Sequence, residues 1–147
     1  MPQNAQEMSP SDVLDSLGEL ISTLAAFAAK VPAVAVMMIT DSRRPDPQAV
    51  EAYEETVYRM RDRTGTTYKS IAPLLLDSLE AFEAGRVFDA VWPLFQVIDR
   101  LVQLHNEGTI LFRQSDQDRL RTYHTRLGKL IPEATTPEIN LPPPTTY

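Results

Sequence analysis

Cysteine is missing from this sequence, and histidine is nearly so. The absence of cysteine excludes a disulfide framework, a thiolate metal site and a cysteine nucleophile. The two histidines are His105 and His124, and neither has a carboxylate three or four residues before it. Metal sites in helical bundles need that Glu-x-x-His spacing, so we predict that the chain binds no metal or other cofactor.

Glycine is also scarce, with five residues scattered singly along the chain. Phosphate-binding loops need clustered glycines, and hydrolases of the G-x-S-x-G type need a serine between two of them. Neither pattern occurs. The acidic group Glu51, Glu54 and Glu55 precedes three arginines and is typical of a solvated helix face. We therefore predict a protein without enzymatic activity or a small-molecule substrate.

Positive charge is in deficit, with 14 lysines and arginines against 20 acidic residues and a net charge of −6. This balance argues against binding to nucleic acid or to an anionic membrane. The apolar run Leu20–Thr40 is 21 residues long, but Lys30 lies at its centre and Pro32 follows. A central lysine costs about 2.5–3.5 kcal/mol in a bilayer, so we expect two buried helical pieces and no membrane span. A cytoplasmic, intracellular location is expected.

Hydrophobic residues make up 43% of the chain, which is enough to form a core. The stretch from Val87 to Asn106 is apolar over most of a helical circumference, as expected for a helix touched by several neighbours. We expect Trp92, Phe95 and Ile98 to be largely buried. Pro93 leaves two alternatives: the helix begins near Asp89, or it begins at Arg86 and kinks at the proline, which we favour.

These patterns predict an all-α bundle of about five helices, forming one domain over residues 1–131. Ser9-Pro10 and Asp46-Pro47 are expected helix starts, and Ser115 is expected to cap the last helix. Pro73 either lies in the first turn of its helix or follows a separate turn. Residues 31–40 have no decisive period, and Pro32 favours a helix there. The expected helices span approximately 10–30, 32–40, 47–63, 67–84, 87–106 and 116–130.

The C-terminal segment, residues 132–147, contains five prolines and no helical period. We predict an extended, Pro-rich tail. Its large apolar side chains are Ile139, Leu141 and Tyr147, which we predict to bind a partner in shallow pockets. The alternative is a disordered terminus.

Two further features predict contacts with other protein chains, either copies of this one or different ones. Met37 and Met38 are adaptable side chains in an apolar stretch, and the alternative for them is ordinary core packing. Residues 1–30 carry a net charge of −3, and residues 109–131 carry +3. We expect the basic segment, through Arg119 and Arg126, to dock on an acidic first helix, within the chain or on a neighbouring molecule.

The run from Pro73 to Gly108 resembles, at the level of pattern, the middle of small helical secretion chaperones such as those for flagellar subunits. It is also similar to a tetratricopeptide hairpin, with Ala84-Gly85 at the turn. The leading functional prediction is a protein–protein interaction module, a small subunit or assembly factor of a larger complex. The alternative, which the resemblance implies, is a chaperone or adaptor that holds a client segment in a groove.

Overall fold

The computed structural model describes residues 8–30, 44–131 and 139. It is all-helical over these residues, as predicted, and no strand occurs among them. The expected helix at 32–40 lies outside the described residues, as does the tail except for Ile139. The elements are α1 (Pro10–Lys30), α3 (Pro47–Arg63), the 3₁₀ helix η1 (Thr66–Ile71), α4 (Ala72–Glu83), α5 (Val87–Asn106) and α6 (Gln114–Gly128).

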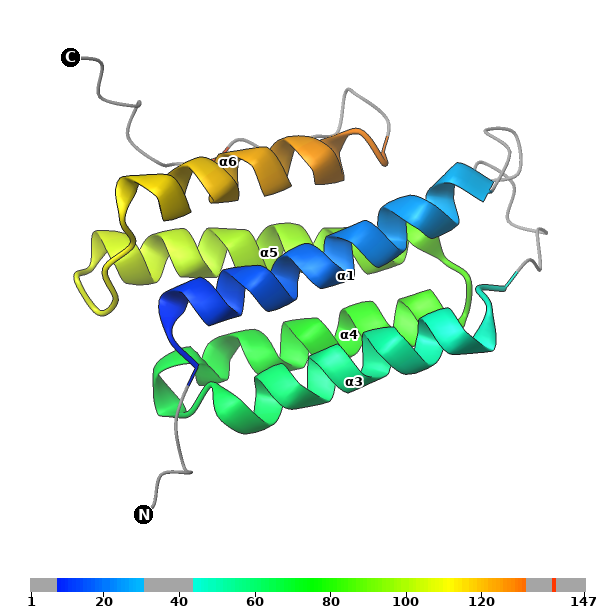
Figure 1. Ribbon diagram of the computed structural model, residues 1–147, viewed down its shortest axis with the longest axis horizontal. Helices are drawn as coiled ribbons and strands as arrows, with labels where there is room; N and C mark the ends of the chain where they lie inside the picture. The colour runs from blue at the N-terminus through cyan, green and yellow to red at the C-terminus, as the bar shows by residue number, and fades with distance from the viewer. Residues whose placement is uncertain (1–7, 31–43, 132–138, 140–147) are drawn as a thin grey trace.

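The helices form a closed ring of contacts. α3 packs on α4, α4 on α5, and α5 on α6, and α6 returns to α1, which itself packs on α3. In Figure 1, α1 lies between the α3–α4 pair below it and the α5–α6 pair above it. Because α1 and α5 also touch, the core is shared by all five helices.

α1 begins where the sequence predicts. The hydroxyl of Ser9 accepts a hydrogen bond from the backbone N–H of Asp12 at 3.1 Å. The Asp12 carboxylate in turn accepts one from the backbone N–H of Ser9 at 3.3 Å. This reciprocal capping satisfies backbone donors that the first turn leaves open. Met8 is buried just before the cap, and its backbone N–H donates to the carbonyl of Arg63, so α1 is fastened to the end of α3.

The stretch expected as one helix over 67–84 is two elements. A 3₁₀ helix covers Thr66–Ile71, with non-helical backbone at Tyr68, and α4 follows from Ala72. The break lies just before Pro73, which has no N–H to donate and occupies the first turn of α4, where that N–H would have no helical partner. Both alternatives for Pro73 are met, because it lies in the first turn of α4 and η1 forms a separate element before it.

α4 and α5 form the tight antiparallel hairpin predicted at Gly85. Gly85 has a φ of +79°, a conformation that costs a residue with a Cβ atom about 1–2 kcal/mol. Its N–H donates to the carbonyl of Phe82, and the N–H of Arg86 donates to that of Ala81. Both bonds belong to the Schellman motif, which ends α4 and reverses the chain within two residues.

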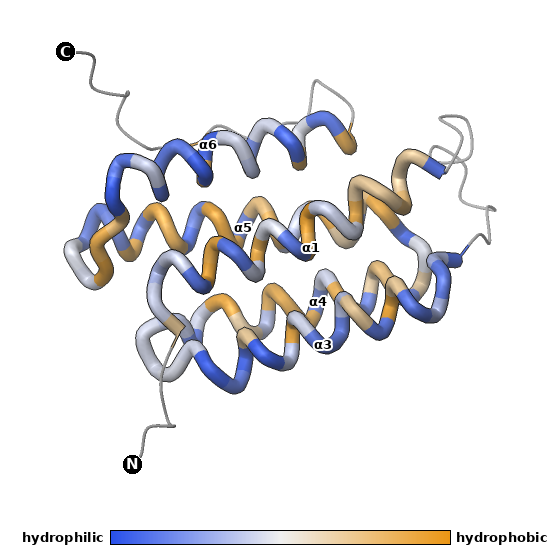
Figure 2. Tube along the Cα trace, in the orientation of Figure 1, coloured by the Kyte–Doolittle hydropathy of each residue, from blue (hydrophilic) through white to orange (hydrophobic). Residues whose placement is uncertain are grey.

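α5 is central, as predicted, and touches α1, η1, α4 and α6. It starts at Val87, directly after its N-cap Arg86, and contains Pro93, so the start near Arg86 is confirmed and the start near Asp89 is wrong. The kink at Pro93 stays a prediction. Phe95 and Ile98 are buried, but Trp92 is 36% exposed, so the prediction of a buried Trp92 is wrong. Orange hydrophobic residues recur along α1, α4 and α5, whereas α3 and α6 are blue over much of their length (Figure 2).

α6 starts and ends two residues before the predicted bounds. Ser115 is not its cap, because the helix already includes this residue. Instead, the carboxylate of Asp116 accepts a hydrogen bond from the backbone N–H of Arg113 at 3.2 Å. Leu120, Tyr123 and Leu127 are buried against the rest of the bundle, as the predicted inward face requires.

One buried polar chain crosses the core from α3 to α5. The hydroxyl of Ser78 donates to the backbone carbonyl of Ala90 at 2.7 Å, so the phenol of Tyr53 is the donor in its bond to Ser78. Burial raises the pKa of Tyr53, and the bond to Ser78 offsets only part of this. The three groups satisfy one another, as buried polar groups must.

Helix length and hydropathy bear on the membrane question. In the ranges 8–30 and 44–131, no helix is both long and apolar enough to cross a bilayer. The second half of the Leu20–Thr40 run lies outside these ranges.

Candidate interaction surface

The structure locates three of the seven residues predicted to bind partners. Arg119 and Arg126 lie on α6, and Ile139 lies beside α5 and α6. The other four, Met37, Met38, Leu141 and Tyr147, lie outside the described residues.

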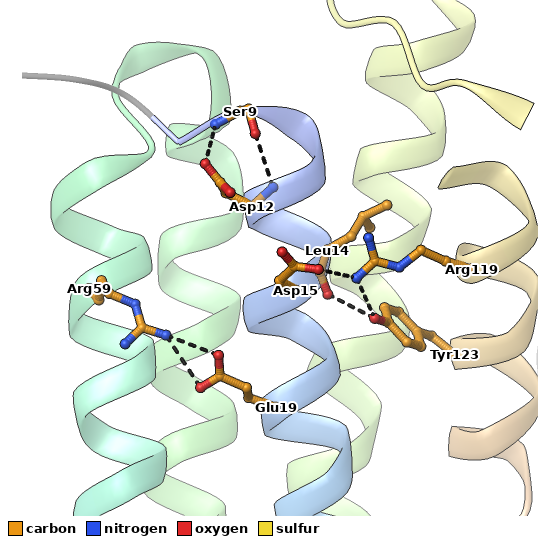
Figure 3. Close-up of polar contacts among 8 residues, drawn as sticks. All are labelled: Ser9, Asp12, Leu14, Asp15, Glu19, Arg59, Arg119 and Tyr123. Carbon is orange, nitrogen blue, oxygen red and sulfur yellow. Dashed lines mark hydrogen bonds and ion pairs between the residues drawn. The ribbon is translucent and has the colours of Figure 1, made fainter. Parts of the chain in front are cut away.

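Arg119 contacts α1 of its own chain. Its guanidinium forms an ion pair with Asp15 and donates to the hydroxyl of Tyr123 at 3.0 Å (Figure 3). That hydroxyl donates in turn to the backbone carbonyl of Leu14 at 3.0 Å. Partial burial lowers the pKa of Arg119, but the hydrogen bonds to Tyr123 and Asp15 outweigh it and leave the pKa raised. Asp15 and Tyr123 thus hold α6 in register on α1.

We call these polar contacts between α1 and α6 the seam. Arg126 adds a contact to the seam about two helical turns after Arg119 along α6. Its guanidinium donates to the hydroxyl of Ser22 at 3.2 Å. On the opposite flank of α1, Glu19 pairs with Arg59 of α3 at 3.4 Å (Figure 3). Of the two docking alternatives, the one within the chain is observed. Because exposed pairs contribute only about 0–1 kcal/mol each, the seam sets orientation more than stability, and partner binding by Arg119 and Arg126 stays a prediction.

The seam is close because α1 carries a glycine opposite Tyr123. A Cβ atom added at Gly18 would lie 2.5 Å from the hydroxyl oxygen of Tyr123 and 3.0 Å from its Cζ atom. Real Cβ atoms essentially never approach other atoms that closely. Gly18 therefore makes room for the Tyr123 phenol to reach the α1 backbone.

A second surface lies between α5 and α6, and we call it the α5–α6 groove. It has a volume of about 370 Å³. Aromatic rings and two isoleucine side chains line it, together with polar groups. Its lining residues are Trp92, Phe95, Gln96, Ile98, Asp99, His124 and Ile139.

Aromatic packing shapes the groove. The ring of Phe95 lies between two others, with centroids 5.6 Å from Trp92 and 5.1 Å from His124. Phe95 and Ile98 are almost fully buried, so their positions are fixed by the core, whereas Trp92 is partly open to solvent. Gln96 and Asp99 are exposed. The groove can therefore bind an apolar side chain, while Gln96 and Asp99 can hydrogen-bond to a peptide backbone.

Of the seven residues that line the groove, only Ile139 was predicted as an interaction residue. The other six, Trp92 and His124 among them, were missed. For Trp92 a signal exists in the sequence. The polar edge of α5 runs through Asp89, Gln96 and Asp99, and Trp92 is three residues after the first and four before the second. Residues at these spacings share one face of a helix, so the pattern places Trp92 on the polar side. For His124 we find no comparable signal.

Within the described part of the chain, no group of three or more histidine and acidic side chains is placed so that it could hold a metal ion. Comparison of the chain with models of protein families, with curated proteins and with solved structures finds no match. The candidate surface is therefore defined by its own geometry.

Proposed function

We propose that this protein is a non-enzymatic interaction module, a small subunit or assembly factor of a larger protein complex. The observation that carries the proposal is the α5–α6 groove, where the exposed Trp92 lies next to the buried side chains of Phe95 and Ile98. An intracellular location belongs to the same proposal and is supported by the absence of cysteine.

The composition of the groove supports protein binding. Tryptophan is among the side chains that most often dominate binding energy, especially when it is surrounded by well-packed neighbours. Trp92 is 36% exposed, yet its ring packs on the buried Phe95, so its position is set before any partner arrives. Preorganisation of this kind lowers the entropy lost on binding.

The second candidate function is a chaperone or adaptor that holds one client segment. The observation favouring it is the size of the groove, which at about 370 Å³ suits one side chain and its flanking backbone better than a broad subunit face. The two functions differ in stoichiometry. A subunit forms a complex of fixed composition, whereas a chaperone binds clients transiently and substoichiometrically.

The test is to isolate the full chain from the cells that make it and to measure the mass and stoichiometry of its complexes. We compare the wild-type chain with Trp92→Glu and with the control Leu111→Glu. Leu111 is 77% exposed and does not line the groove. We expect a fixed-stoichiometry complex that Trp92→Glu abolishes and Leu111→Glu preserves.

Circular dichroism and thermal midpoints of both variants check that each one folds. A complex that survives Trp92→Glu unchanged would contradict the use of this groove. Binding in variable, substoichiometric amounts that still depends on Trp92 would favour the chaperone.

A further inference from the structure

Ile139 of the C-terminal segment lies on the α5–α6 groove of its own chain. It is half-buried and packs against the hydrophobic core. It also lines the groove together with Trp92, Phe95 and His124. The sequence predicts a partner-binding role for this side chain, but here its contacts are intramolecular.

The number of residues after the bundle is large enough for this contact. Ile131 is buried at the end of the helical bundle, and Ile139 follows eight residues later. Eight extended residues span roughly 26 Å at about 3.3 Å each. Along α6, His124 precedes Gly128 by four residues, or about 6 Å. The number of residues between Ile131 and Ile139 is therefore sufficient for the contact.

The chemistry of the segment suits an extended ligand. Ile139 lies between Pro137 and Pro142, and its immediate neighbours in the sequence are Glu138 and Asn140. Proline is unfavourable in a helix interior, and its restricted φ lowers the entropy that an extended peptide loses on docking. The result is an apolar side chain between polar ones, opposite a groove with an apolar floor and the polar residues Gln96 and Asp99.

We propose that the α5–α6 groove is a binding site for extended, proline-flanked peptides with an aliphatic anchor, occupied in the free protein by the chain's own Ile139. The same groove carries the proposed function, so a partner that uses it must displace Ile139. Displacement is feasible because about 370 Å³ of space remains beside Ile139, which itself stays partly exposed.

The test uses the fluorescence of Trp92, the only tryptophan in the chain. We compare the full-length protein with Ile139→Asp and with the control Thr146→Asp, which adds the same charge to the same tail away from the anchor. Loss of the anchor exposes Trp92 further. We expect a red-shifted emission and stronger acrylamide quenching for Ile139→Asp, and neither change for Thr146→Asp.

A synthetic peptide of residues 134–145 then tests the groove directly. Added to the Ile139→Asp protein, it is expected to restore the wild-type emission, whereas a peptide with aspartate at position 139 is not. Wild-type protein should bind the peptide at least roughly tenfold more weakly than the Ile139→Asp protein does, because its own tethered Ile139 competes at a millimolar effective concentration.

Three results would overturn this inference. One is an emission that Ile139→Asp leaves unchanged or that Thr146→Asp changes equally. Another is failure of the peptide to restore the emission of the Ile139→Asp protein. The third is a wild-type emission that depends on protein concentration together with a doubled mass, which would assign the groove to the tail of a second copy. None of these readouts depends on a partner, so failure of the complex-isolation test would leave them intact.

Discussion

Replacing Gly18 with alanine has two opposite effects on the free energy of unfolding: it raises the helix propensity of α1, and it adds a Cβ atom where Tyr123 packs. Alanine favours a helix interior over glycine by about 0.8–1.0 kcal/mol, so the substitution should stabilise an isolated α1. In the folded protein, however, the new Cβ atom would lie 2.5 Å from the hydroxyl oxygen of Tyr123. The phenol cannot simply swing aside, because it bonds both to Leu14 and to Arg119.

The magnitudes favour destabilisation. Overpacking at a close contact costs about 1–3 kcal/mol. Losing the bond from Tyr123 to the Leu14 carbonyl costs about 0.5–1.5 kcal/mol more. Set against the gain in helix propensity, Gly18→Ala should lower the free energy of unfolding by roughly 0.5–3.5 kcal/mol.

Tyr123→Phe supplies the matched background. It removes the hydroxyl, and the nearest remaining atom is Cζ at 3.0 Å, which a small shift can accommodate. In this background we expect Gly18→Ala to be neutral or stabilising by up to about 1 kcal/mol. Urea denaturation of the four proteins, with m-values compared, gives the coupling energy between the two sites. Equal stabilisation by Gly18→Ala in both backgrounds would refute the close docking of α6 on α1.

Three further predictions concern the core, pH and the α5–α6 turn. Phe95→Ala should lower the free energy of unfolding by about 3–5 kcal/mol, and a loss of under about 1 kcal/mol in urea denaturation would contradict its buried position. Tyr53 has a raised pKa in the folded protein, so its contribution to stability is complete below the unfolded tyrosine pKa of about 10 and is lost as the pH rises through the folded value. Urea denaturation above about pH 10 should therefore show stability falling less steeply in Tyr53→Phe than in the wild type, and equal slopes would argue against the burial of the phenol. Gly108→Ala should cost about 1–2 kcal/mol in thermal or urea unfolding from backbone conformation alone, because Gly108 has a φ of +80° and no atom within 4 Å of an added Cβ; a neutral result would contradict that conformation.

Local signals in the sequence predicted the helices well. The bounds of α1, α3 and α5 agree with the structure because each start has a cap, a proline or a change in hydrophobic period that acts within a few residues. The errors also have local causes. The expected helix at 67–84 breaks before Pro73, which has no backbone N–H to donate and lies in the first turn of α4. α6 begins before Ser115 because Asp116, rather than Asp118, is the acidic residue that bonds back to the backbone.

The candidate surface was much less predictable, because it forms from residues distant in the sequence. Trp92 and His124 are 32 positions apart and meet only when α6 folds back on α5. Ile139 also lines the groove. The sequence predicts that this side chain binds a partner, whereas in the structure it contacts its own chain. Likewise, the charge pattern predicts that Arg119 contacts an acidic first helix, but it does not distinguish the helix of the same chain from that of a neighbouring copy, since both have the same acidic residues. Tertiary packing decides these contacts.

Site-specific photo-crosslinking tests the central claim, that the α5–α6 groove is where this protein meets others. A photoreactive amino acid replaces Gln96, at the groove, or Gln48, an exposed control position on α3. Irradiation in the cells that make the protein should give one crosslinked product of defined mass from position 96 and none from position 48. The product should disappear when Trp92→Glu is added. Crosslinks of equal yield from both positions, or a position-96 product that persists with Trp92→Glu, would contradict the claim.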